Sequence, residues 1–70
     1  MMPLSLADTD ATYIIKRVGG NEKVKKHLEN LGFVVGSEVM LVTSMNGNVI
    51  VKVKEARIAI SDEMARKIMI

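Results

Sequence analysis

The dipeptide Asn46-Gly47 constrains the fold of this chain more than any other feature of its sequence. It separates two runs rich in β-branched and other apolar residues, 38–45 and 48–54. Asparagine and glycine tolerate positive φ angles, which a type I′ turn requires at both of its central positions. The pair therefore predicts a tight β-hairpin whose strands are 38–45 and 48–54.

The same hairpin predicts which side chains share a face. Counting back from the loop, one face holds these cross-strand pairs: Ser44 with Val49, Val42 with Val51, and Met40 with Val53. This almost wholly apolar face is expected to be the core, because side chains alternate between the two faces of a strand. The opposite face would pair Thr43 with Ile50 and Leu41 with Lys52. It has more aliphatic carbon than a solvated face needs, so Leu41 and Ile50 are candidate partner-binding residues.

A three-turn amphipathic helix is expected over about residues 21–31. Its apolar positions recur at i, i+4 and i+7: Val24, Leu28 and Leu31. Asn21 suits the N-cap, and Gly32 suits the left-handed position that follows the last turn. Phe33 would then pack back onto Leu28, the usual companion of a Schellman stop. The boundaries of this helix are therefore predicted as well as its existence.

The remaining segments complete a mainly β fold. The β-branched and aromatic run 11–18 predicts a strand that ends at Gly19-Gly20, and 57–60 predicts another. Ser61 would cap a short C-terminal helical turn, followed by a terminal strand over 68–70. We expect one domain over residues 1–70, an SH3-like barrel of about five short antiparallel strands, with an open α+β sheet as the alternative. A chain this short buries little surface, so weak self-association is compatible with it.

The residue composition argues against catalysis and against a dedicated metal site. The chain has no cysteine, which excludes disulfides, thiolate metal sites and a thiol nucleophile. His27 is the only histidine, whereas a metal site needs several convergent ligands and a serine nucleophile needs an oriented base. We therefore expect no enzyme activity and no cofactor, and only weak contact with any transition-metal ion.

The charge pattern favours a solvated helix surface over a nucleic-acid interface. Lys23, Lys25 and Lys26 form a basic cluster, but acidic residues flank it and the formal net charge is only +2. The only aromatic residues are Tyr13 and Phe33, too few for the stacking platforms of nucleic-acid-binding barrels or the groove of a polyproline-binding domain. We expect no nucleic-acid partner. The second candidate protein-binding surface is the exposed side of this helix: Lys23, Lys26, His27 and Glu29.

No segment resembles a secretory signal or a membrane span. The first fifteen residues contain two acidic residues and no basic residue before an apolar core, unlike a signal peptide. The apolar run 31–35 is far shorter than the ~20 residues that a membrane helix needs. The expected location is cytoplasmic, with any membrane association made through a partner.

Residues 26–39 form a recognisable motif: Lys-His-Leu-Glu-Asn-Leu-Gly-Phe-Val-Val-Gly-Ser-Glu-Val. This order resembles that of the FeoA family, which has a basic residue, Leu, two spacers, Leu-Gly-aromatic or aliphatic, a spacer, Pro-Gly, two spacers and Val. The similarity continues through segments 47–53, 57–60 and 65–70, and includes Leu4-Ser5-Leu6. Three positions depart from the family pattern: Val35 stands where proline is common, His27 where arginine is common, and Asp10 where glycine is frequent.

The resemblance implies an SH3-like barrel that acts in the cytoplasm with FeoB, a ferrous iron transporter that has an N-terminal GTPase domain. The expected function is that of an accessory or regulatory protein of ferrous iron uptake, acting by protein–protein interaction. The alternative is a free barrel related to the C-terminal domain of DtxR-type metal-dependent transcriptional repressors. The chain lacks a helix-turn-helix, so under this alternative it would not bind an operator alone.

Overall fold

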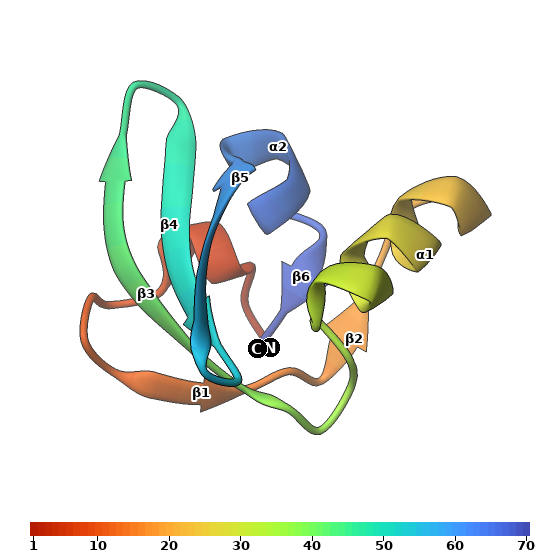
Figure 1. The fold of residues 1–70 in the computed structure, drawn as a ribbon, viewed down its shortest axis with the longest axis horizontal. Coiled ribbons are helices and arrows are strands. Elements are labelled where there is room, and N and C mark those ends of the chain that lie inside the picture. Colours follow the sequence, from red (N-terminus) through yellow and green to blue (C-terminus); the bar gives the residue numbers. More distant parts are fainter.

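Two antiparallel sheets surround one apolar core in the computed structural model, which describes residues 1–70 (Figure 1). The elements follow the chain in this order: η1 (Leu4–Leu6), β1 (Thr12–Ile14), β2 (Arg17–Val18), α1 (Glu22–Leu31), β3 (Glu38–Met45), β4 (Asn48–Val53), β5 (Ala56–Ser61), α2 (Asp62–Ala65) and β6 (Ile68–Met69). The larger sheet has the strand order β1-β3-β4-β5, and the smaller sheet pairs β2 with β6. In Figure 1 the larger sheet lies at the left, and α1 and the β2–β6 pair lie at the right. The predicted mainly β fold with one internal helix and a C-terminal helical turn is confirmed.

The β3–β4 hairpin forms at the predicted loop. Asn46 and Gly47 have φ angles of 51° and 78°, and Met45 pairs with Asn48 across the loop. Both central residues are therefore left-handed, as a type I′ turn requires. The predicted turn chemistry is confirmed.

The predicted register of this hairpin is correct only near the loop. Thr43 pairs with Ile50 as expected, but the register shifts between Leu41 and Thr43, so that Leu41 pairs with Val51. A β-bulge adds one residue to one strand and moves every side chain beyond it to the other face. The predicted pairs Val42–Val51, Met40–Val53 and Leu41–Lys52 are wrong for this reason. Leu41 is only 4% exposed and belongs to the core, not to the outer face where the sequence placed it.

The core is entirely apolar. No polar or charged residue is buried, and the buried residues come from every part of the chain: Leu4, Ala7, Ile15, Leu28, Phe33, Val39, Leu41, Val49, Val51, Val53, Ile60, Ala65, Ile68 and Ile70. No buried side-chain nitrogen or oxygen atom lacks a hydrogen-bond partner. The interior is therefore stabilised by burial of apolar surface and contains no polar network that could serve as a site.

The segment 11–18 forms two strands, not the single strand that its composition predicts. The Ile15 N–H donates to the Ser37 carbonyl at 2.9 Å, and the next N–H, of Lys16, donates to the Met69 carbonyl at 2.8 Å. The chain therefore changes from the larger sheet to the smaller one between these residues, with Ile15 buried at the corner. Because of this change of partner the chain has six strands, where the sequence predicts about five. Residues 12–14 and 17–18 each pair with another strand, so neither segment is left without a hydrogen-bonded neighbour.

Both ends of α1 are built as predicted. Asn21 Oδ1 accepts a hydrogen bond from the Val24 N–H at 2.9 Å. Gly32 has a φ of 107°, and the Phe33 N–H donates to the Leu28 carbonyl at 2.9 Å. This is the hydrogen bond of a Schellman motif, and both Leu28 and Phe33 are fully buried. The helix stop therefore also fixes the end of α1 to the core.

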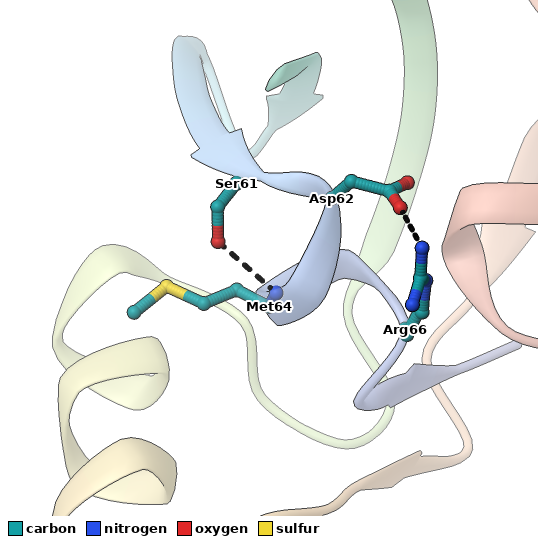
Figure 2. A network of polar contacts seen from close by, with 4 residues as sticks. All are labelled: Ser61, Asp62, Met64 and Arg66. Atoms are coloured by element: carbon teal, nitrogen blue, oxygen red, sulfur yellow. Dashed lines mark hydrogen bonds and ion pairs between the residues drawn. The ribbon is translucent and has the colours of Figure 1, made fainter. Parts of the chain in front are cut away.

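The short helix α2 is fixed by two polar contacts that Figure 2 shows. Ser61 Oγ accepts from the Met64 N–H at 3.2 Å, which confirms the predicted cap. Arg66 Nη2 donates to Asp62 Oδ2 at 2.6 Å, the only ion pair within the chain. The Met64 side chain extends toward α1 in this view and is half-buried. The C-terminal turn thus orients an apolar side chain between the two helices.

Replacing Val35 by proline is expected to stabilise the protein. The Ser37 N–H donates to the Val34 carbonyl at 3.0 Å and Gly36 has a φ of 92°, so Val35 occupies the second position of a type II turn. Proline is favoured there, and the Val35 N–H makes no backbone hydrogen bond that proline would remove. Because proline restricts the unfolded chain, V35P should raise the free energy of unfolding by about 0.4–1 kcal/mol.

Urea denaturation followed by circular dichroism measures this gain. V35A is the matched control, since it removes the same exposed side chain without fixing φ. A V35P variant no more stable than V35A would contradict the turn assignment.

Candidate functional site

Four of the six candidate residues lie on one exposed surface of α1. Lys23, Lys26, His27 and Glu29 are all exposed, and in Figure 1 α1 projects from the barrel at the right. None of the four makes a side-chain hydrogen bond or an ion pair within the chain. The four are free to contact a partner, but nothing in the fold organises them into a site with fixed geometry.

His27 is not part of a cluster of possible metal ligands. No group of three or more His, Cys, Asp or Glu side chains is close enough to hold a metal ion. Structural and catalytic sites for transition metals draw three or four such ligands from the protein. The chemistry that α1 offers is therefore charge and hydrogen bonding at a surface.

The other two candidate residues, Leu41 and Ile50, lie on opposite faces of the larger sheet. Ile50 lies on the outer face of the larger sheet, paired with Thr43 on one side and Ala59 on the other, and is half-buried. Leu41 points into the core on the opposite side of the same sheet. The bulge after Leu41 accounts for the difference, because it changes which face each residue of β3 occupies.

We define the outer face as the side chains of the larger sheet that point away from the core: Thr12, Ile14, Glu38, Met40, Thr43, Met45, Ile50, Lys52, Arg57 and Ala59. Ile14 and Met45 are 46% and 57% exposed, which is high for large apolar side chains. These two side chains lie at opposite ends of β3, since Ile14 pairs with Glu38 and Met45 pairs with Asn48. The outer face therefore mixes aliphatic, hydroxyl and charged side chains without a single apolar patch.

A groove of about 370 Å³ lies at one end of the outer face. Its lining residues are Thr12, Ser37, Glu38, Val39, Met40, Lys52 and Lys54. The register places Thr12, Met40 and Lys52 in one row across β1, β3 and β4. The groove therefore has an apolar floor at Met40, a hydroxyl at one wall and ammonium groups at the other, and the carboxylate of Glu38 also lines it.

Sequence reasoning did not identify Lys52 and Lys54 as site residues. For Lys52 the signal was its position between the buried Val51 and Val53, since alternate side chains of a strand point to opposite faces. Lys54 lies in the turn after β4, where strand alternation does not apply. The sequence did not show where β1 pairs. Its pairing with β3 places Thr12 beside Met40 and forms the second wall of the groove. The groove is thus a product of strand order.

Comparison with known proteins identifies the family. The FeoA domain model matches residues 2–70. The chain belongs to the FeoA family. It is 31% identical over 70 residues to the Fe(2+) transport protein A of Methanocaldococcus jannaschii. The alignment covers all of this chain and 85% of that protein. The predicted family is confirmed.

The fold of this FeoA domain agrees with solved structures of the family. FeoA from Stenotrophomonas maltophilia, solved with bound zinc and described as a prokaryotic SH3 domain protein, has a TM-score of 0.85 and 25% identity, covering 99% of this chain and 88% of that one. The predicted SH3-like fold is confirmed. Asp10, where the family pattern often has glycine, has a φ of 65°, the left-handed region that glycine adopts most easily.

A manganese-dependent transcriptional repressor has the same fold in part of its chain. The match has a TM-score of 0.84 and 14% identity, covering 94% of this FeoA domain but only 38% of the repressor. At this identity the likeness concerns the fold alone. It agrees with the predicted relation to a repressor barrel and assigns no function.

The FeoA domain contains no helix long and apolar enough to cross a membrane.

Proposed function

We propose that this FeoA domain is an accessory protein of ferrous iron uptake, located in the cytoplasm, that acts by binding the GTPase part of the FeoB transporter. The observation that carries the proposal is the family match, which extends over residues 2–70. The relative from Methanocaldococcus jannaschii bears the name of an Fe(2+) transport protein. In this proposal ferrous iron is the cargo of the transporter, and the FeoA domain contributes a binding surface.

The residues of the chain support a binding role over a catalytic one. The single histidine is exposed on α1, and the chain has no cysteine. Acid–base and nucleophilic catalysis usually need several reactive side chains that converge in a pocket. Exposed apolar side chains on a sheet instead favour association with another protein.

Two surfaces are available for the contact. One is the exposed side of α1 with Lys23, Lys26, His27 and Glu29, and the other is the outer face around Ile50. The α1 surface offers mixed charge, whereas the outer face offers aliphatic carbon bordered by cations. The two surfaces contain different residues, so a partner bound to one would shift a different set of amide resonances from a partner bound to the other.

An amide NMR titration with the cytoplasmic GTPase part of FeoB tests the proposal. We expect chemical-shift changes at one of the two surfaces, and a change in their extent when nucleotide is added. Ferrous ion alone should shift few amides. Absence of any shift at a large excess of the GTPase part, with and without nucleotide, would contradict contact with that part of the transporter.

The second candidate function is a role in transcription beside a metal-dependent repressor. The fold shared with the manganese-dependent repressor favours it. A gene for a large GTPase-transporter next to the gene for this chain would favour the transport role. A neighbouring gene for a repressor that lacks its own barrel would favour the transcriptional one.

A further inference from the structure

The outer face and its border carry more cations than acids, and these charges are unpaired. The cations are Lys52, Lys54 and Arg57, and the acids are Glu38, which also lines the groove, and Glu55, beside Lys54 in the turn after β4. None of the five forms an ion pair or a side-chain hydrogen bond, since the only ion pair joins Asp62 and Arg66. A surface with an excess of unpaired cations attracts an anionic partner.

The groove combines these cations with an apolar floor. Met40 is half-buried between Thr12 and Lys52 in one row of the sheet. At about 370 Å³ the groove has room for a few side chains. Only every second side chain of an extended segment faces the groove, because successive side chains point to opposite faces. A segment whose groove-facing residues are acidic and aliphatic in turn would therefore match this row.

The backbone places Lys54 at the rim of the groove. Lys54 has a φ of 56° in the tight turn between β4 and β5, a conformation that a lysine adopts with strain. Its aliphatic stem runs beside the end of α1, since a Cβ placed on Gly32 would lie 3.8 Å from Lys54 Cδ. Glycine or asparagine would adopt this φ more easily, so a lysine here costs some conformational free energy. A binding role for the Lys54 side chain would explain why a lysine stands at this position.

We propose that the groove between β1 and β4 binds an acidic, extended segment of the protein partner. Lys52 and Lys54 pair with its carboxylates, and Met40 receives an aliphatic side chain beside them. This inference rests on the proposed function, because it names the chemistry of the partner's contact segment. The hollow shape favours a peptide over a flat anionic membrane, which would contact a convex basic surface.

The first test measures binding of the GTPase part of FeoB to charge-reversed variants by calorimetry. K52E/K54E should weaken binding by about tenfold or more, with the loss reduced at high salt. K16E/R17E is the matched control: it makes the same change in net charge at exposed residues of the smaller-sheet side, and should change affinity by less than about threefold. Amide spectra verify that both variants remain folded.

The outcomes of this test separate the proposals. Unchanged binding by K52E/K54E, or equal losses in both variants, would overturn the groove proposal while leaving the transporter contact intact. If the chain with its natural sequence does not bind the GTPase part, the proposed function fails at that point. The groove is then judged by the second test.

The second test uses a synthetic peptide and does not depend on the transporter. A capped hexapeptide with glutamate, leucine and glutamate at its alternate positions, and serine at the positions between them, should shift the amides of Thr12, Met40, Lys52 and Lys54. The same peptide with glutamine in place of glutamate should not. Shifts centred on α1, no shifts with the acidic peptide, or stronger groove shifts with anionic bicelles than with the peptide would each overturn the proposal.

Discussion

Leu41→Ala is expected to lower the free energy of unfolding by about 2–4 kcal/mol. Ile50→Ala, in the next strand, is expected to lower it by about 1 kcal/mol or less. Leu41 is 4% exposed in the core, whereas Ile50 is half-buried on the outer face. The deletion in the core loses burial and leaves a cavity, and the deletion on the outer face leaves no cavity.

Urea denaturation of the two variants measures the difference. Equal losses of stability would contradict the bulge, because the register without it places Leu41 and Ile50 on the same face. The result also decides how binding studies should be designed. A polar substitution at Leu41 should reduce partner binding by unfolding the chain, so of these two residues only Ile50 can report on the outer face.

Phe33→Ala is expected to lower the free energy of unfolding by about 3–5 kcal/mol. Phe33 is fully buried and is the largest of the buried side chains. Its N–H also closes the Schellman hydrogen bond to Leu28 at 2.9 Å. Small domains have a total stability of about 5–15 kcal/mol, so the loss should bring the chain close to unfolding at room temperature.

Phe33→Leu is the control for this prediction. An aliphatic residue at this position fits the family pattern, fills most of the space and should cost about 1 kcal/mol. Thermal melts and the amide resonances of α1 follow both variants. If Phe33→Ala melts within a few degrees of the unchanged protein, Phe33 does not fix the helix to the core.

The sequence determined the parts of the fold that depend on neighbouring residues. The turn at Asn46-Gly47, the Asn21 and Ser61 caps and the Gly32 stop were all predicted. Each is a contact between residues fewer than six positions apart, so the residue types alone specify it. The family pattern could also be recognised from the sequence, and it includes two of these local features, Gly32 and Gly47.

The candidate site was only partly predictable for the same reason. The α1 surface and Ile50 were found from helical and strand periodicity. Leu41 was misplaced because one extra residue in β3 exchanges the faces of the strand beyond it. The tight turn at Lys54 was missed because lysine is not a turn residue that favours a positive φ.

Tertiary structure decided which strands meet. At the bulge, the Leu41 carbonyl accepts a hydrogen bond from the Asp10 N–H at 3.0 Å, a contact between segments far apart in the sequence. Between Ile15 and Lys16 the chain exchanges one sheet for the other. The sequence by itself determined the turns, the caps and the helix. Pairing of distant strands determined the register, the burial of Leu41 and the groove, because those depend on free energies summed over the whole core and not on any one segment.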